Sequence, residues 1–240
     1  GGAARGGSGP DHPREPGAGA PPQPADPLAE RHPLAYSGPP YAQHVETLPL
    51  VFSSGWASGI NAYLVVLVLG VADRVNPMPD IPDVLGRWDV LAAAAFMYAM
   101  EFIADKIPYI DSTWDAISTA IRPTAGAVVG VLLAGDASTL QQAVMGVVGG
   151  GSALASHLVK SGSRLAINAS PEPASNIAAS VTEDVAVLGV VWYAIDHPRA
   201  AAAIAAVLLL IGLVLLFFIG RMIRRGWRRW KRKDPIHAVT

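Results

Sequence analysis

The chain has 240 residues, of which 51% are apolar and 15% are charged, and its formal net charge is −1. Soluble domains average about 25% charged residues, so this composition indicates a membrane protein. The near-neutral charge gives no overall attraction to nucleic acid, which is not expected as a partner. The chain contains no cysteine, which excludes disulfides and thiolate metal sites.

The N-terminal segment 1–46 is rich in proline and glycine, with 10 of the 20 prolines and no apolar run. Such a segment cannot bury enough surface to offset the entropy lost on ordering. It also lacks the apolar core of a signal peptide. We therefore predict a disordered tail over 1–46, a transmembrane domain over 47–220 and a basic cytoplasmic tail over 221–240.

The clearest apolar run, Ala200–Gly220, contains 21 residues without a charge. A helix of this length is about 31 Å long, which is enough to cross the hydrocarbon core of a bilayer. Weaker candidate spans are Trp56–Val75, Trp88–Ile107 and Ser175–Ile195. The pattern predicts an all-α fold, namely a polytopic transmembrane helix bundle with about 4–6 spans.

Two glycine-rich runs, Thr124–Gly135 and Ala143–Val159, lie between these candidates. As a helix the first would extend only about 18 Å, short of a core of about 30 Å. The runs are either short spans or the arms of a re-entrant hairpin, and their glycines favour close helix packing. The segment Asp111–Ile121 is predicted to be an interfacial helix, with Asp111 and Asp115 in solvent.

The segment after Gly220 carries eight of the 18 Lys and Arg residues. Basic residues beside a span stay in the cytoplasm, so the C-terminus of this plasma-membrane protein is predicted to be cytoplasmic. Counting the spans backwards places the N-terminus in the cytoplasm as well. Anionic lipid headgroups are the expected partners of the basic tail, at about 1 kcal/mol for each basic residue. The predicted headgroup contacts are Arg221, Arg224, Arg225, Arg228 and Arg229.

The segment Lys160–Asp184 is polar although it lies between apolar runs. Ionisable groups near hydrocarbon are costly and usually mark a function or a buried pairing. A helix that starts near Pro173 places Glu183 and Asp184 about 15 Å along it, near the bilayer midplane, whereas a shorter helix places them at an interface. The candidate polar pathway comprises Asn61, Asn168, Glu172, Asn176, Glu183 and Asp184. The candidate charge partners are Glu101, Asp105, Lys106, Arg122, Lys160 and Arg164.

Two acidic motifs each have a structural and a functional interpretation. Glu172 lies at a predicted helix start, where the helix dipole favours an acid, and is equally a candidate ligand for a cation or proton at a broken helix. Glu101 and Asp105 share a helix face, but their spacing does not define a metal site. The motifs HExxH, GxSxG and GxxxxGK[ST] are absent, so the cofactor is unknown and enzymatic activity is undecided.

The pattern Ser-Gly-x-x-x-x-Ile-Asn-Ala occurs twice, at Ser54–Ala62 and Ser161–Ala169. Transporters often contain internal repeats with a site at the repeat interface. The two copies indicate either such a repeat or two similar helix starts capped by Ser and Asn.

The chain resembles a known membrane-protein family in two segments, EFIADKIPYIDSTWDAISTAIRPTAG (Glu101–Gly126) and KSGSRLAINASPEPASNIAASVTED (Lys160–Asp184). The string SGINAY (Ser58–Tyr63) supports the resemblance. The family is the bacterial integral membrane family called domain of unknown function DUF4126, and the resemblance extends over roughly Leu48–Phe218. The resemblance implies a membrane fold and does not imply a particular reaction.

Three hypotheses for function follow from the polar segment. The first is a small transporter or channel for a solute or cation, with a polar site within the membrane. The second is a non-catalytic membrane scaffold whose polar residues pair within the bundle. The third is a membrane-embedded lipid-processing enzyme whose acids act as metal ligands or bases. A homo-oligomer is one open assembly state.

Overall fold

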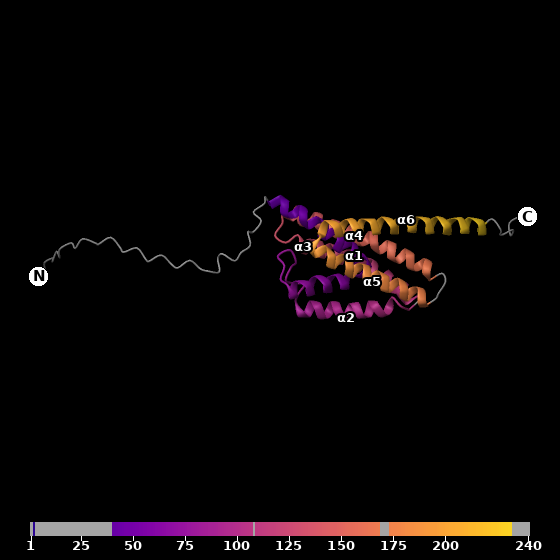
Figure 1. The fold of residues 1–240 in the computed structure, drawn as a ribbon, viewed down its shortest axis with the longest axis horizontal. Helices are drawn as coiled ribbons and strands as arrows, with labels where there is room; N and C mark the ends of the chain where they lie inside the picture. The colour runs from indigo at the N-terminus through magenta and orange to yellow at the C-terminus, as the bar shows by residue number, and fades with distance from the viewer. Residues whose placement is uncertain (1, 3–39, 108, 169–172, 232–240) are drawn as a thin grey trace, which may run out of the picture. The chain divides into compact units, whose positions relative to one another are not determined.

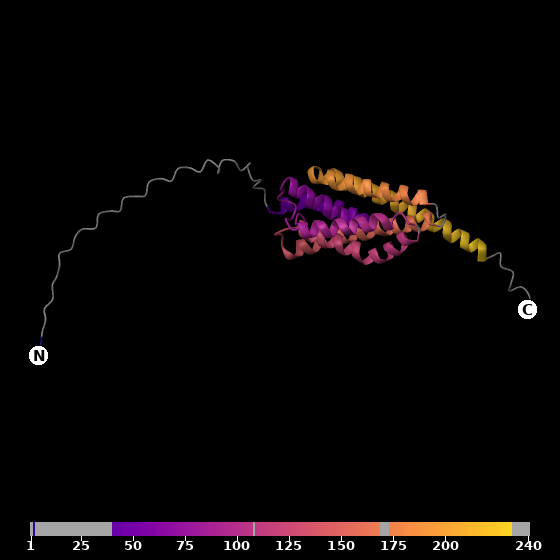
Figure 2. The ribbon, with the colours of Figure 1, turned by 90° about the horizontal axis from the view of Figure 1, so that it is seen from below.

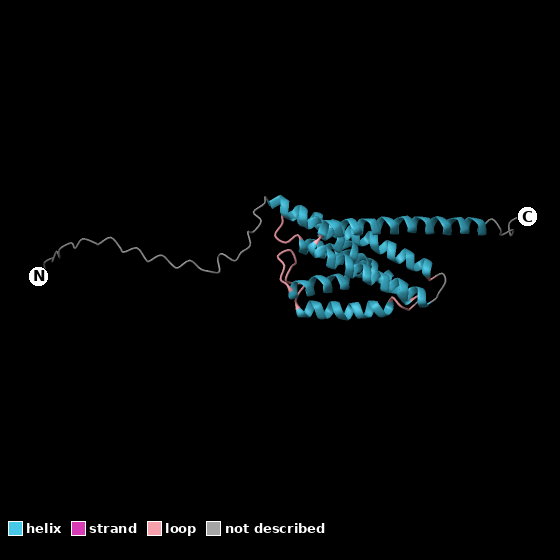
Figure 3. Ribbon diagram, in the orientation of Figure 1, coloured by secondary structure: helices cyan, strands magenta, loops and turns pink. Residues whose placement is uncertain are grey.

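The computed structural model describes residues 2, 40–107, 109–168 and 173–231, and within them it has six α-helices and no strand (Figures 1 and 3). The predicted all-α fold is therefore confirmed. In chain order the helices are α1 (Pro40–Val75), α2 (Trp88–Ala104), α3 (Ile110–Leu133), α4 (Thr139–Ile167), α5 (Pro173–Asp196) and α6 (Pro198–Lys231).

Among the described residues, five helices are long and apolar enough to cross a membrane, which confirms a helix bundle with several spans. They are Thr47–Val75, Ile110–Leu133, Thr139–Ile167, Ala174–Asp196 and Pro198–Arg228. Helix α2 falls short of this group because its 17 residues extend only about 25 Å.

Two helices cross the predicted domain limits. Helix α1 begins at Pro40, within the segment 1–46 that the composition assigns to a tail, and α6 continues to Lys231, into the predicted basic tail. The rest of both predicted tails, residues 3–39 and 232–240, lies outside the described residues.

The glycine-rich runs belong to two long helices. The predicted interfacial segment Asp111–Ile121 and the run Thr124–Gly135 are joined in α3, a helix of 24 residues that continues through Pro123. The run Ala143–Val159 lies within α4, a helix of 29 residues that starts with a capping box formed by Ser138 and Gln141. Both helices are therefore longer than the predicted short spans, and both are long and apolar enough to cross a membrane.

Helix α1 is interrupted at Asn61, whose φ of −151° and ψ of 93° are not helical. The half before the break runs parallel to α4, because Gly55 lies against Gly149 and Gly59 lies against Ala153. The half after the break turns back toward the start of α2, where Gly70 lies against Leu91 (Figure 1). The candidate span Trp56–Val75 thus contains a break that the sequence did not predict.

The bundle has two ends, which we name after the helices that mark them. The α1 end contains the loop 76–87, the turn 134–138 and His197 between α5 and α6 (Figures 1 and 3). The α6 end contains the end of α2, the start of α3, the end of α4 and the start of α5. Because α1 turns back at Asn61, both Thr47 and Val75 lie toward the α1 end.

Glycines allow α1, α3 and α4 to pack at backbone distance. A Cβ on Gly126 would lie 2.7 Å from the carbonyl oxygen of Gly149, and one on Gly55 would lie 2.5 Å from the same oxygen. A Cβ on Gly130 would strike the backbone of Met145. The predicted packing role is therefore confirmed for these glycines, whereas a Cβ on Gly151 would meet nothing within 4 Å.

Candidate functional site

The break in α1 is held by the side chain of Asn61. Its Oδ1 accepts a hydrogen bond from the backbone N–H of Leu64 at 3.0 Å, as a cap of the second half-helix does. Its Nδ2 donates to Asp184 Oδ1 of α5 at 3.0 Å. One amide side chain thus starts a helix and ties it to a neighbouring helix.

The same break leaves backbone carbonyls at the end of the first half-helix without helical partners. Arg122 Nη1 donates to the carbonyl of Gly59 at 3.5 Å, and Lys160 Nζ donates to that of Ile60 at 3.1 Å. Cations suit this position because the C-terminal end of a helix carries partial negative charge. The interrupted helix is therefore completed by basic side chains from α3 and α4.

Arg122 is 1% exposed and joins α3 to three other helices. It contacts Glu101 Oε1 at 2.7 Å and Asp115 Oδ1 at 3.0 Å, and its Nη1 donates to His157 Nδ1 at 2.9 Å. A guanidinium has only donors, so Nδ1 of His157 must be the acceptor and Nε2 must carry the hydrogen. Nε2 then donates to Thr119 Oγ1 at 2.9 Å.

Lys160 places one ammonium group among carboxylates from two other helices. Its Nζ lies 2.6 Å from Asp105 Oδ2, 3.4 Å from Glu101 Oε1 and 3.6 Å from Glu183 Oε2. The lysine side chain is 2% exposed. A buried ammonium requires such pairing because its desolvation is expensive.

Arg164 forms a two-pronged pair with Glu183, with Nη2–Oε2 at 2.7 Å and Nε–Oε1 at 3.3 Å. Its Nη1 donates to the carbonyl of Asp105 at 2.8 Å and lies 3.5 Å from Asn176 Oδ1. Asp111 Oδ2 is 3.8 Å from the same nitrogen. Arg164 thus links α4 to the end of α2, the start of α3 and α5.

Asn168 closes the α6 end of this assembly. Its Nδ2 lies 2.9 and 3.0 Å from the two carboxylate oxygens of Asp111 and 2.8 Å from Ser112 Oγ. Its Oδ1 accepts from Asn176 Nδ2 at 2.9 Å. The end of α4 is therefore bonded to the starts of both α3 and α5.

Carboxylates outnumber basic groups in this charged cluster. The basic members are Arg122, Lys160 and Arg164, and the acidic members are Glu101, Asp105, Asp111, Asp115 and Glu183. All are buried apart from Glu183, whose side chain is 19% exposed. Several carboxylate oxygens, namely Glu101 Oε2, Asp105 Oδ1 and both of Asp115, accept no hydrogen bond from the described residues.

Most of the residues singled out in the sequence meet in or beside this cluster. The candidate charge partners do so except Lys106, which instead donates to Ser180 Oγ at 3.3 Å. The candidate pathway residues Asn61, Asn168 and Asn176 contact cluster members or their neighbours, and Asp184 is bonded to Asn61. Glu172 lies outside the described residues.

Sequence reasoning placed Asp111 and Asp115 in solvent, which is wrong because they are 0% and 3% exposed. On α4, His157, Lys160 and Arg164 follow a helical spacing of three and four residues and share a buried face. The same periodicity joins Asp111, Asp115 and Arg122 on α3. This face periodicity of polar residues is the signal that could have identified them.

The basic part of α6 lies apart from the cluster. Helix α6 extends beyond the other helices at the α6 end (Figures 1 and 2), and the side chains of Arg221, Arg224, Arg225 and Arg228 are exposed there. The side chain of Arg229 is outside the described part of the chain. Contact of these arginines with lipid headgroups stays a prediction.

The fold and the cluster define a multi-span α-helical membrane protein with a buried charged network. Among the described residues, no group of three or more His, Asp or Glu side chains is placed to hold a metal ion. The model of the family described as Domain of unknown function (DUF4126) matches residues 48–217, and the chain belongs to this family. No curated protein and no solved structure matches the chain.

Proposed function

We propose that the protein is a small transporter in which protons or a small cation bind to the charged cluster at the break in α1. The observation that carries this proposal is the excess of carboxylates in the cluster, five against three basic groups, with four of the five carboxylates buried. A charge inside the membrane costs about 2.5–3.5 kcal/mol by insertion scales, so an uncompensated excess does not persist there. Bound protons or a bound cation would compensate it.

Lys160 is the basic residue best suited to exchange with a bound cation. Its ammonium is a compact charge on a flexible stem, and it already occupies the point where Glu101, Asp105 and the carbonyl of Ile60 converge. Exposed carbonyls at a broken helix and nearby carboxylates are the groups that coordinate ions in many transporters. An incoming cation would compete with Lys160 for these oxygens.

A flux assay tests this proposal. Purified protein in proteoliposomes is exposed to gradients of protons and of small monovalent and divalent cations, and internal dyes report the flux. We expect flux in the wild type and at least a ten-fold reduction in Glu101→Gln and Glu183→Gln, because each variant removes a cluster charge. Asp80→Asn, in the exposed loop of the α1 end, is the matched control and should retain wild-type flux.

Equal flux in the wild type and both cluster variants, for every ion tested, would contradict the proposal. A scaffold is the second candidate, favoured by the pairing of every basic side chain in the cluster with at least one carboxylate. Its signature is loss of folded yield in both Glu→Gln variants together with no flux above empty liposomes for the wild type.

We also propose that the α6 end faces the cytoplasm, since the exposed arginines of α6 lie there. From α2 to α6 the chain then passes five times between the two ends of the bundle, although α2 is shorter than the candidate spans, while α1 turns back at Asn61. Thr47 would therefore lie on the side opposite to the arginines. The cytoplasmic N-terminus predicted from the sequence instead requires that Trp56–Val75 crosses the membrane.

The absence of native cysteine makes this topology directly testable. Single-cysteine variants Leu48→Cys, Asp80→Cys and Arg228→Cys are treated in intact cells with a membrane-impermeant maleimide. We expect the first two to be labelled from outside and Arg228→Cys only after permeabilisation. Labelling of Leu48→Cys together with Arg228→Cys would show that α1 crosses the membrane.

A further inference from the structure

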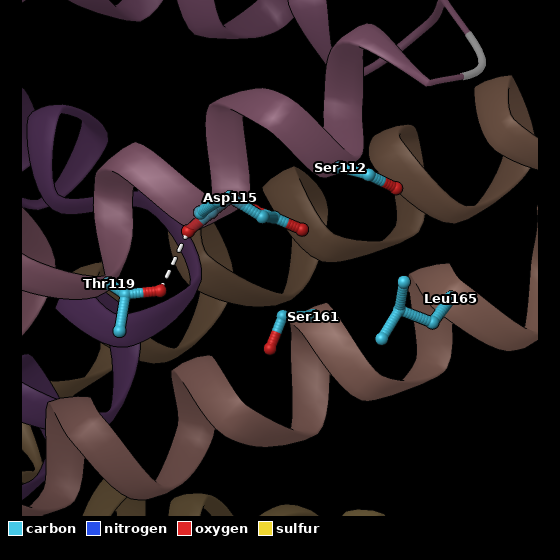
Figure 4. Close-up of a pocket in the computed structure, with 6 residues that line it drawn as sticks. Ser112, Asp115, Thr119, Ser161 and Leu165 are labelled. Carbon is cyan, nitrogen blue, oxygen red and sulfur yellow. Dashed lines mark hydrogen bonds between the residues drawn. The ribbon is translucent and has the colours of Figure 1, made fainter.

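A pocket of about 230 Å³ opens between α3 and α4, next to the charged cluster. It is lined by Ser112, Asp115, Ala116 and Thr119 of α3 and by Ser161 and Leu165 of α4. Figure 4 shows the α3 residues on one side and the two α4 residues on the facing helix. Pockets for drug-sized ligands measure about 300–1,000 Å³, so this one suits a smaller group.

Asp115 supplies the charge of this pocket. The residue is 3% exposed, and Arg122 Nη1 lies 3.0 Å from its Oδ1. Neither carboxylate oxygen accepts a hydrogen bond from the described residues. Buried carboxylates almost always accept hydrogen bonds, so an Oδ2 without a partner, beside an Oδ1 held only by its ion pair with Arg122, indicates at the wall of a pocket a donor that comes from outside the chain.

The hydroxyl groups of the pocket add acceptor capacity. Ser161 Oγ donates its hydrogen to the carbonyl of His157 at 3.0 Å, and Thr119 Oγ1 donates to the carbonyl of Asp115 at 2.9 Å. With their hydrogens committed to the backbone, both oxygens offer only lone pairs to a ligand. None of the described residues that line the pocket is basic. A carboxylate and hydroxyl acceptors together favour a positively charged group that carries several N–H donors.

We propose that this pocket binds an ammonium group that carries N–H donors, from either an aminolipid headgroup or a soluble amine. The rim contains Leu165, which is 66% exposed and would face lipid. Ser112 lies near the start of α3, at the α6 end, so the pocket is within reach of the headgroups of that leaflet. The inference is independent of transport, because a scaffold could bind the same group.

The test compares an ammonium group with and without N–H donors. Native mass spectrometry measures how many molecules of phosphatidylethanolamine or phosphatidylcholine stay bound to the purified protein. In parallel, thermal unfolding in detergent is followed with ethanolamine or choline. The ammonium groups of phosphatidylcholine and of choline carry the same positive charge as those of the ethanolamine compounds but have no N–H. We therefore expect a preference of about ten-fold for the ethanolamine compound in one arm or both.

Two variants remove the site in different ways. Asp115→Asn removes the carboxylate charge, and Ala116→Phe fills the pocket while leaving the contact between Asp115 and Arg122 in place. Ala120→Phe, exposed on the same helix and outside the pocket lining, is the control for added bulk. We expect both site variants to lose the preference and the control to keep it.

Each outcome decides the proposal. A preference in the lipid arm alone assigns the headgroup, and one in the soluble arm alone assigns a small amine. Equal binding of the ethanolamine and choline forms in both arms would overturn the proposal. So would a preference that survives in Ala116→Phe, a result that can be read even if Asp115→Asn does not fold.

Discussion

Helices α4 and α6 run side by side in the same direction, with Val159 against Gly212 and Gly162 against Leu216, yet they contribute differently to the molecule. Helix α6 has the highest mean hydropathy of the candidate spans, but only 6% of its most apolar 18-residue stretch is buried in the protein. Helix α4 has the lowest mean hydropathy of these candidates, and 39% of the corresponding stretch is buried.

The difference shows what holds a bundle together in lipid. Lipid tails are as apolar as leucine, so apolar side chains give little reason for one helix to prefer another helix to lipid. Helix α4 instead offers glycines at backbone distance and a face with His157, Lys160 and Arg164. High hydropathy therefore identifies the helix that is most exposed to lipid, while small and polar residues identify the helix that packs and pairs with its neighbours.

The largest effect on stability is expected when a buried arginine of α4 is replaced and compared with an exposed arginine of α6. Arg164→Ala in α4 leaves Glu183 without its two-pronged partner, and breaking a buried pair costs about 3–5 kcal/mol of unfolding free energy. Arg224→Ala in the exposed part of α6 should change it by less than about 0.5 kcal/mol. Denaturant titration in mixed micelles, followed by circular dichroism, measures both.

Similar stability losses in the two arginine variants would show that α6 contributes as much to the fold as α4. Arg164→Lys adds a control, because it keeps the charge but loses the planar fork that matches Glu183. An intermediate loss is expected for it.

A smaller effect is expected within α4 from glycines that lie two residues apart. A Cβ at Gly149 would strike the backbone carbonyl of Gly126, whereas one at Gly151 would meet nothing within 4 Å. Gly149→Ala should therefore destabilise the protein by about 1–3 kcal/mol through overpacking. Gly151→Ala should be neutral or stabilise by up to about 1 kcal/mol, because alanine is the better helix former. Thermal unfolding of the matched pair provides the measurement, and equal midpoints would exclude close packing as the role of Gly149.

Elements that depend on local composition could be predicted from the sequence, whereas contacts that depend on neighbouring helices could not. Ala200–Gly220 was identified because an uncharged run of that length has few alternatives, and it is part of α6. Glu101, Asp105, Lys160 and Arg164 were identified as partners because charges in apolar helices must pair. Which carboxylate pairs with which base depends on helix rotation, which the sequence does not contain.

The break in α1 could not be predicted from its own residues. The run after Trp56 is apolar and has the length of a span, and Asn61 alone does not end a helix. The break persists because Arg122 and Lys160, far away in sequence, bond to the carbonyls that it frees. The burial of Asp111 and Asp115 has the same origin, since their basic partners lie on later turns and another helix.

The repeated pattern acquires a structural description. Both copies end a helix: the first half of α1 stops at Asn61 and α4 stops at Asn168. Each asparagine donates to an aspartate, Asp184 in the first copy and Asp111 in the second. The pattern therefore marks the end of a helix in both copies, and in the first copy Asn61 also caps the half-helix that follows.

The smallest effect concerns the exposed arginines of α6, and it sharpens the contrast with α4. Arg224→Gln and Arg228→Gln should each weaken the retention of anionic lipid by about 1 kcal/mol, with no change in unfolding. Native mass spectrometry with phosphatidylglycerol, and with phosphatidylcholine as the uncharged-lipid control, measures this retention. The loss should vanish near 1 M salt, where the Debye length is about 3 Å, because these charges are exposed and easily screened. The pairs of Arg164 are buried and should not respond to salt. A salt-independent loss in the α6 variants would instead mean that these arginines bind a specific partner at close range.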